Sequence, residues 1–264
     1  MRDQSENSDR AGAGVWGEVK LCLGVLTRIP VSFDREAAPG DLARASRWFP
    51  LVGLIFGAVG ALVLLCAQWL DFPPTLAAGL CLVVLVFLSG SFHEDGLADV
   101  ADGFGGGISR DQKLEIMRDS RIGTHGVLAL VFSVGLRWVL LSALIAENPE
   151  RAIYALIVAA CLSRLALVLL MKALAPARAD GLGAGAGRPD YPSVLVALFL
   201  SLAVTLIFQD WRLIAAALAA LVLAVAIVAR LAWKQIGGQT GDVLGAGQQT
   251  AEVLILLAAF MVAQ

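Results

Sequence analysis

Seven long apolar runs constrain this chain more than any other feature. They cover approximately residues 48–70, 74–92, 126–146, 152–174, 192–208, 213–233 and 243–262. A helix of about 20 apolar residues crosses the roughly 30 Å hydrocarbon core of a bilayer. Hydrophobic residues make up 58% of the chain and charged residues only 16%, which is typical of a polytopic membrane protein. We therefore predict an all-α integral membrane protein with about seven transmembrane helices.

Two segments precede the first run. Residues 1–14 are polar and lack the apolar core of a signal peptide, so we expect a disordered cytosolic leader. Residues 15–26 mix apolar and charged side chains and are too short to span a bilayer, which predicts an interfacial helix that ends before Pro30. Residues 15–264 are expected to form a single helical membrane domain.

Basic residues in the connecting segments predict the orientation, because Lys and Arg in short loops favour the cytoplasm. The tight connections near residues 71, 147–151 and 209–212 carry only two arginines between them. Nearly all other basic residues lie before the first run or in three longer segments, which are residues 93–125, 172–191 and 230–242. This alternation predicts that the N-terminus and every large polar segment face the cytoplasm, and that the C-terminus lies outside.

An acidic cluster follows the second apolar run. Four carboxylates lie within nine residues, which are Glu94, Asp95, Asp99 and Asp102. On a helix, the three aspartates have the spacing i, i+4 and i+7 and share one face, where three oxygen ligands can converge on a hard cation. Glu94 would point about 100° away from Asp95. Carboxylates that hold Mg²⁺ are typical of phosphate chemistry, so we predict a metal site formed by these aspartates.

Cations and two candidate proton acceptors accompany these acids. Arg110, Arg118 and Arg121 would complement a diphosphate. Asp119 and His93 are both candidates for the general base, and the sequence does not choose between them. The alternative is a solvated loop with weak ion pairs.

Two arginines lie inside apolar runs. Arg137 and Arg164 would each cost about 2.5–3.5 kcal/mol at the bilayer centre, so each should face a carboxylate or a polar cavity. We include Arg164 among the candidate substrate-binding residues for this reason.

Two glycine-containing cytosolic segments supply further candidates for substrate binding. One contains Arg178 and Asp180, and the other contains Thr240 and Asp242. For the second pair, helix capping is the alternative interpretation.

Several of these motifs resemble those of the cobalamin synthase family, also called adenosylcobinamide-GDP ribazoletransferases. The resemblance depends chiefly on two long motifs, which are His93-Glu94-Asp95-Gly96-Leu97-Ala98-Asp99 with Ala101-Asp102-Gly103, and Leu114-Glu115-Ile116-Met117-Arg118-Asp119-Ser120-Arg121-Ile122-Gly123-Thr124-His125-Gly126. It extends over nearly the whole chain after the leader, through Leu26-Thr27-Arg28-Ile29-Pro30, Phe49-Pro50-Leu51-Val52-Gly53, Ser163-Arg164, Ala177-Arg178, Asp180-Gly181-Leu182-Gly183, and Thr240-Gly241-Asp242 with Leu244-Gly245-Ala246.

This resemblance implies a late step in the assembly of the coenzyme B12 nucleotide loop. Such an enzyme joins adenosylcobinamide-GDP to α-ribazole or its 5′-phosphate, gives adenosylcobalamin or its phosphate, releases GMP and uses Mg²⁺. The resemblance also implies a multi-pass protein of the bacterial inner membrane, with the lipid bilayer and the two substrates as its partners. Because a corrinoid is large, we expect a wide cytosolic cavity roofed by the segments around Gly105 and Gly183.

The net charge of −2 and the lack of a basic tail argue against a nucleic-acid partner, and the sequence leaves homo-oligomerisation open.

Two alternative functions also remain open. The acidic pattern partly resembles that of CDP-alcohol phosphotransferases, but it lacks their spacing of glycines and acids. A transporter would place its ionisable groups near the bilayer midplane, whereas the acids here lie at the end of an apolar run.

Overall fold

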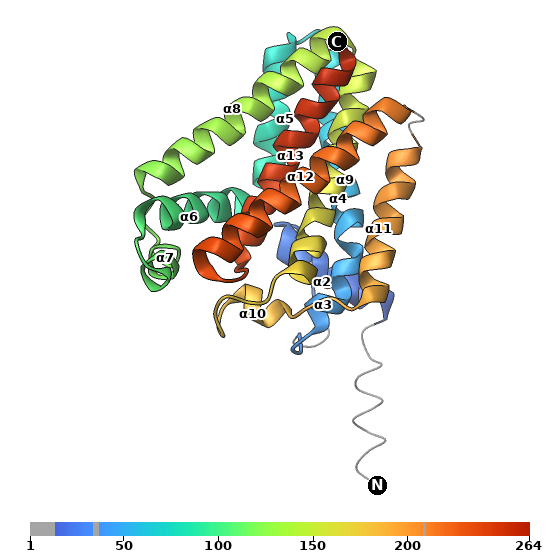
Figure 1. Cartoon of the computed structure of the whole chain (residues 1–264). Coiled ribbons are helices and arrows are strands. Elements are labelled where there is room, and N and C mark those ends of the chain that lie inside the picture. Colours follow the sequence, from blue (N-terminus) through green and yellow to red (C-terminus); the bar gives the residue numbers. More distant parts are fainter. Residues whose placement is uncertain (1–13, 34–36, 208–209) are drawn as a thin grey trace.

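A computed structural model describes residues 14–33, 37–207 and 210–264, so nearly all of the predicted leader lies outside the described residues. Helices are the only elements longer than a single bridge in the described ranges (Figure 1). They are α2 (Val15–Leu26), α3 (Asp41–Ala45), the 3₁₀ helix η1 (Ser46–Trp48), α4 (Phe49–Trp69), α5 (Pro74–Ser89), α6 (Phe92–Gly106), α7 (Arg110–Ile116), α8 (Thr124–Glu147), α9 (Pro149–Ala173), α10 (Leu182–Ala186), α11 (Tyr191–Leu206), α12 (Trp211–Ile236) and α13 (Gly241–Ala263).

The all-α membrane architecture is confirmed, and each predicted apolar run forms a helix. Five helical segments are long and apolar enough to cross a bilayer, which are Asp41–Trp69, Thr124–Glu147, Pro149–Ala173, Trp211–Ile236 and Gly241–Ala263. A sixth span exists if α5 and α6 are counted together. The remaining apolar helix, α11, is shorter. Among the described residues, the number of spans is therefore five or six by length, against the seven predicted.

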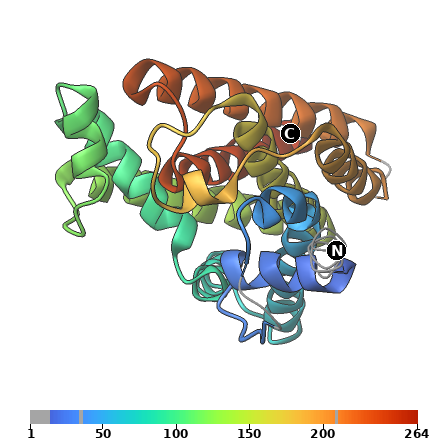
Figure 2. The ribbon, with the colours of Figure 1, turned by 90° about the horizontal axis from the view of Figure 1, so that it is seen from below.

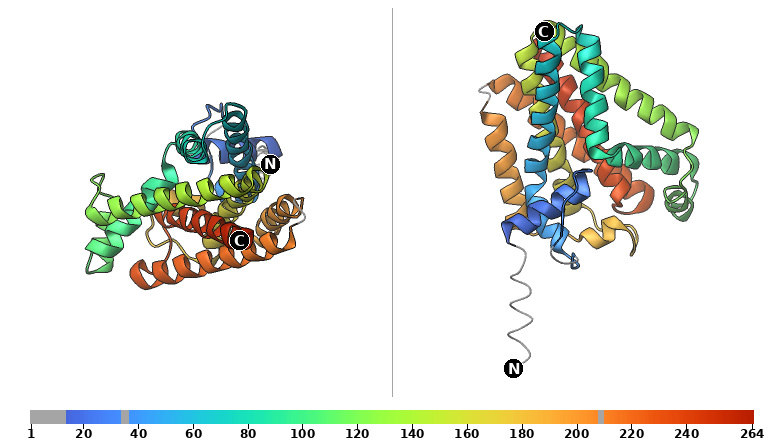
Figure 3. Two further views of the ribbon diagram at one scale, coloured as in Figure 1. Left: turned by 90° about the horizontal axis from the view of Figure 1, so that it is seen from above. Right: turned by 180° about the vertical axis from the view of Figure 1, so that it is seen from behind.

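The second apolar run differs from the predicted single span because the chain bends sharply where α5 meets α6. Gly90 and Ser91 both adopt left-handed backbone conformations, with φ of 63° and 60°. This conformation ends a helix, and it is uncommon for a residue other than glycine. The axis of α6 consequently turns by 87° from that of α5. The helix that carries the acidic cluster therefore extends sideways from the bundle instead of continuing along α5 (Figures 1 and 3).

The polar segments gather at one end of the bundle, as the distribution of basic residues predicted. Figure 1 shows α2, α3 and α10 at this end and α7 toward it below α6, while the connections from α4 to α5 and from α8 to α9 lie at the other. Seen from this end, α7 and the adjoining part of α6 project beyond the other helices (Figure 2). The predicted interfacial helix α2 is held here by buried Glu18, which accepts hydrogen bonds from Arg44, Arg47 and Trp48.

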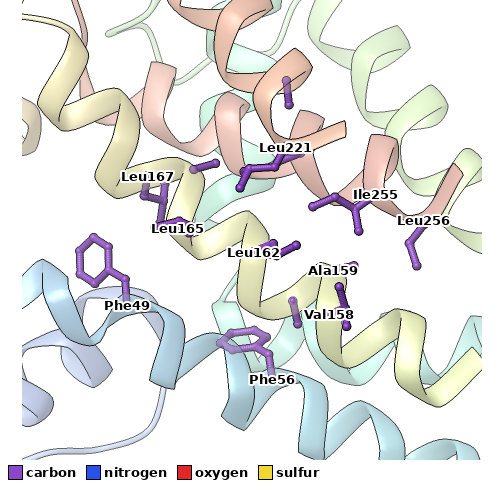
Figure 4. Packing of buried hydrophobic residues seen from close by; sticks show 14 of the residues in the cluster. Phe49, Phe56, Val158, Ala159, Leu162, Leu165, Leu167, Leu221, Ile255 and Leu256 are labelled. Carbon is purple, nitrogen blue, oxygen red and sulfur yellow. The ribbon is translucent and has the colours of Figure 1, made fainter. Parts of the chain in front are cut away.

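Helix α9 forms the centre of the hydrophobic core. Its side chains are buried along most of its length, and it packs against α4 on one side and α13 on the other (Figure 4). Leu162 and Leu165 are fully buried within it, and Phe56 of α4 and Ile255 of α13 are nearly so. Burial of such side chains supplies about 1.5–3 kcal/mol each relative to exposure in water.

A network of buried charges crosses this core. Arg137 of α8 forms ion pairs with Glu94 of α6 at 3.1 Å and with Glu252 of α13 at 3.4 Å. Arg164 of α9 pairs with Glu252 at 3.2 Å, and its guanidinium group stacks on Phe56 at 4.1 Å. Both arginines are only 3% exposed. The prediction that each faces a carboxylate is confirmed, and the acid that interrupts the last apolar run is their shared partner.

Helices α6 and α13 approach closely at two glycines. A Cβ atom on Gly96 would lie 2.9 Å from the carbonyl oxygen of Asp242, and one on Gly245 would lie 3.2 Å from the Cα atom of His93. Small residues allow helix backbones to approach in this way. The contact places the first turn of α13 beside the acidic residues of α6.

We predict that Glu252→Gln strongly destabilises the protein. The change leaves Arg164 without a carboxylate partner in a water-poor interior, and breaking a buried ion pair typically costs about 3–5 kcal/mol. Thermal unfolding in a fixed detergent would measure the loss. Thr250→Val on the same helix is the control, because the Thr250 hydroxyl bonds only to the Ala246 carbonyl. Equal midpoints for the two variants would contradict the assigned role of the network.

We also predict opposite effects for two Gly→Ala substitutions. Gly96→Ala should lower stability by about 1–3 kcal/mol, because overpacking forces α6 away from α13. Gly135→Ala in α8 should leave stability unchanged or raise it by up to about 1 kcal/mol, since its Cβ would meet nothing within 4 Å and alanine favours the helix. Unfolding midpoints measured side by side would test this, and a harmless Gly96→Ala would refute the close approach.

Candidate active site

A cleft of about 580 Å³ opens where α5, α6, α8 and the connection between α7 and α8 meet. Its size suits a nucleotide-sized ligand. The charged and hydroxyl side chains that line it are Ser91, Glu94, Asp95, Asp99, Arg118, Asp119 and Ser120. The two long motifs singled out in the sequence therefore face each other across one cavity.

Asp95 and Asp99 lie one helical turn apart on the cleft side of α6. Burial, and after it the negative charges of Asp95, Asp242 and Asp102, together raise the pKa of Asp99 to about 7, while the positive charge of Arg178 opposes them. Nearby like charges disfavour the ionised carboxylate. This part of the site therefore has an excess of negative charge that a cation would relieve.

Asp102 points away from this pair. One of its oxygens accepts a hydrogen bond from the Gly123 amide at 2.7 Å, and the other accepts one from the Gly126 amide at 2.9 Å. Both amides belong to the first turn of α8, whose unpaired N–H groups attract a negative charge. Asp102 therefore attaches the start of α8 to α6.

The described residues contain no ready-made metal shell of three His, Cys, Asp or Glu side chains. The predicted trio of Asp95, Asp99 and Asp102 is therefore not gathered around one point, because backbone amides hold the third member. Asp242 acts electrostatically on both Asp95 and Asp99, and its backbone contacts Gly96. Oxygen donors with surplus negative charge are the chemistry that Mg²⁺ prefers. Asp95, Asp99 and Asp242 match this cation in donor type and charge, but like the predicted trio they do not form a ready-made shell in the described residues.

A chain of ion pairs connects the cleft to Asp242. Arg118 contacts both carboxylate oxygens of Asp180, at 2.5 and 2.7 Å. Arg178 lies 4.0 Å from Asp180 and 3.5 Å from Asp242. Four residues predicted to bind substrate are therefore brought together from segments about 60 residues apart. Arg118 and Asp180 are largely exposed, so their pairing contributes little to stability and can be exchanged for a ligand.

Asp119 forms a second exposed pair at the cleft. Arg121 contacts its two oxygens at 3.1 and 2.6 Å. Hydrogen bonds from the side chain and the backbone amide of Arg121 lower the pKa of Asp119 to about 2. A carboxylate with such a low pKa is a weak general base near neutral pH.

Four other predicted site residues lie elsewhere. The His93 imidazole and the Arg164 guanidinium are buried inside the bundle and do not line the cleft. Arg110 donates to the carbonyl oxygens of Ile236 and Ala177, and so joins α7 to the end of α12 and to the segment after α9. These positions give no support to direct contact with a substrate in the cleft, because none of these three side chains lines it.

Thr240 is the fourth, and it caps α13 where the capping alternative expected Asp242 to be the N-cap residue. It is 1% exposed, its hydroxyl oxygen accepts a hydrogen bond from the Val243 amide at the start of α13, and the same hydroxyl contacts Asp242 at 3.0 Å. Gly237 ends α12 with a left-handed φ of 76°. Thr240 therefore positions Asp242 instead of presenting itself to a ligand.

The cleft is not the wide corrinoid cavity that we expected between the segments around Gly105 and Gly183. Gly105 packs against the ring of His125, and Gly183 packs against Gln239 and Thr240. Neither glycine lines the cleft. The apolar wall that sequence reasoning missed is formed by Val86, Ala98, Met117, Ile122, Leu130 and Val134. These side chains carry no chemical signature, so only their assembly around the acids reveals them.

Comparisons with known proteins agree with these motifs. A family model described as cobalamin-5-phosphate synthase matches residues 18–260. An adenosylcobinamide-GDP ribazoletransferase of Bradyrhizobium diazoefficiens is 46% identical over 93% of this chain and 94% of its own length. The proteins of the same name from Azorhizobium caulinodans and Mesorhizobium japonicum are 46% and 44% identical, over 95% and 92% of this chain and 97% and 92% of their own lengths. No solved structure matches the chain significantly.

We predict that Asp102→Asn lowers thermal stability without removing a response to Mg²⁺. The amide nitrogen would face a backbone N–H donor, and an unsatisfied buried group costs about 1–3 kcal/mol. Unfolding midpoints with and without Mg²⁺ would measure both quantities, with the exposed Asp111→Asn as control. Loss of the Mg²⁺-dependent shift in Asp102→Asn alone would show instead that Asp102 is a metal ligand.

Proposed function

The chain belongs to the cobalamin-5-phosphate synthase family, and on this premise we propose that it is an adenosylcobinamide-GDP ribazoletransferase. It transfers the cobinamide phosphate of adenosylcobinamide-GDP to α-ribazole or α-ribazole 5′-phosphate. The products are adenosylcobalamin or its 5′-phosphate, and GMP. The observation that carries this proposal is the family match itself, since its range of 18–260 contains every residue of the cleft.

In the proposed reaction, a ribose hydroxyl of ribazole attacks the phosphorus atom that bears cobinamide. A new P–O bond forms to the acceptor, the bond from this phosphorus to the oxygen bridging to GMP breaks, and GMP leaves with the electron pair. The hydroxyl proton passes to a base. Such reactions depend mainly on positioning and on neutralising charge around the phosphates.

Two arginines near the cleft bind the diphosphate of the substrate in this proposal. Arg118 lies on the cleft wall and is about half exposed, so its guanidinium group can exchange Asp180 for phosphate oxygens. Arg178 has an Nη1 atom without a hydrogen-bond partner among the described residues, and it lies beside Asp242. Guanidinium groups bind phosphate oxygens through paired hydrogen bonds, which suits both arginines to this task.

Asp95, Asp99 and Asp242 would hold Mg²⁺ in this proposal, while Asp102 positions α8. The cation would supply neutralisation of the negative charge of the diphosphate and of GMP. The charge excess around Asp99 supports this assignment, because ordinary ion pairs do not balance it.

Asp119 is the better placed of the two candidate bases, because it lines the cleft and His93 does not. Its low pKa depends on Arg121, which is 87% exposed. When Arg121 turns to a substrate phosphate, the pKa of Asp119 rises toward its ordinary value. Substrate binding would then release the carboxylate that accepts the proton.

The protein acts in the bacterial inner membrane, with its cleft facing the cytoplasm. Its relatives are bacterial, and several of its helices are long and apolar enough to span a bilayer. The end of the bundle that carries the cleft also carries most of the basic residues, and such segments favour the cytoplasmic side.

Release of GMP from adenosylcobinamide-GDP and α-ribazole 5′-phosphate tests this function. We predict release by the wild type only with Mg²⁺, and a loss of about 100-fold or more in Asp95→Asn, comparable to losing other charge-stabilising groups. Asp111→Asn serves as the control, because Asp111 is 90% exposed on α7. Release of CMP from a CDP-alcohol instead would show that the phospholipid-synthase alternative is correct.

A further inference from the structure

A second cavity adjoins the cleft on the membrane side. It is a groove of about 700 Å³ between α5 and α8, and its lining includes Gly79, Leu80 and Val83 of α5. Val86 and Val134 line both the groove and the cleft. The polar cleft therefore adjoins an apolar groove along a wall that these two valines share.

The groove offers almost no hydrogen-bonding groups. Of its lining side chains, only Thr75 and Trp138 carry a polar atom. The Trp138 indole N–H already donates to the Thr75 carbonyl at 2.7 Å, at the end of the groove farthest from the acids. A ligand that enters the groove from the cleft must consequently be apolar.

The proposed substrates differ in their suitability for this space. Guanine carries several donors and acceptors that would lose their partners here, and a corrinoid is too large for either cavity. The base of ribazole is a benzimidazole, which is flat, aromatic and without an N–H donor. Of the parts of the two substrates, this base is the one that matches an apolar wall beside a polar cleft.

We propose that Val86 and Val134, which line both the groove and the cleft, together with Leu130 of the cleft wall, bind the aromatic base of the ribazole acceptor. This inference depends on the proposed function. With the base between these side chains, the attached ribose extends toward Asp95 and Asp99, which line the same cleft. Apolar recognition at one end and phosphate chemistry at the other then belong to the same cleft.

A lipid acyl chain is the competing occupant, and the cleft argues against it at this end. A chain reaching Val86 and Val134 would press hydrocarbon against Glu94 and Asp95 without giving them hydrogen bonds. A nucleoside places ribose hydroxyls there instead. The outer part of the groove, near Thr75, has no such acids and can hold lipid without this cost.

The test is Val134→Phe, assayed by GMP release in lipid nanodiscs. A larger side chain would occupy the base subsite, so the KM for α-ribazole 5′-phosphate should rise about tenfold or more while the KM for adenosylcobinamide-GDP stays within about twofold. Val131→Phe is the matched control, because Val131 lies on the same helix, is 58% exposed and does not line either cavity. Val134→Ala is the second variant, and it should raise activity with a bulkier acceptor base relative to ribazole.

Different outcomes would refute the proposed function and the base subsite. A wild type that releases no GMP would refute the proposed function itself. An active wild type in which Val134→Phe behaves like Val131→Phe, and Val134→Ala does not change acceptor preference, would refute only the base subsite. Equal changes in both KM values that vary with the acyl chains of the nanodisc would identify a lipid as the occupant and overturn the proposal.

Discussion

Four buried charges hold the centre of this molecule together. Glu94, Arg137, Arg164 and Glu252 come from four different helices and carry no net charge as a group. An unpaired charge is costly in a water-poor interior, so each of these four side chains needs an oppositely charged partner from another helix. The mutual positions of α6, α8, α9 and α13 are therefore coupled through these contacts, in addition to their apolar packing. Gln248 and Gln249 extend the network, since their amides hydrogen-bond to Glu252 and Glu94.

The network also determines which way α6 faces. Glu94 pairs with Arg137 and also lines the cleft, and Asp95 and Asp99 line the same cleft one helical turn apart. Gly96 faces α13 and brings Asp242 close. One short helix thus carries an acid of the buried network, the acids of the candidate site and a packing glycine. The turn at Gly90 and Ser91 directs this helix away from the axis of α5 by 87°.

Around the cleft, the arginine side chains are held by ion pairs that are weak because solvent reaches them. Arg118 and Arg121 each contact an aspartate, and all four groups are at least one-third exposed. Such pairs hold the guanidinium groups near the cavity at little energetic cost, and a diphosphate with more charge can replace the aspartates. The buried and exposed ion pairs of this protein therefore have different roles: the first locate the helices, and the second prepare a binding surface.

Much of this could be predicted from the amino-acid order. Apolar runs determine that the chain is a helical membrane protein, and the pairing of Arg137 and Arg164 with carboxylates follows from the cost of charge in a bilayer. Local spacing also indicated where the acids lie, but it could not show that backbone amides of α8 occupy Asp102, that Thr240 caps a helix, or that His93 is enclosed. Those outcomes depend on contacts between residues far apart in the chain. The sequence by itself determined the helices, the lipid environment that suits them and the charged residues available for chemistry. Only the tertiary structure decided which charges are buried as partners and which line the cleft, because that choice depends on how α6 turns and what packs against each of its faces.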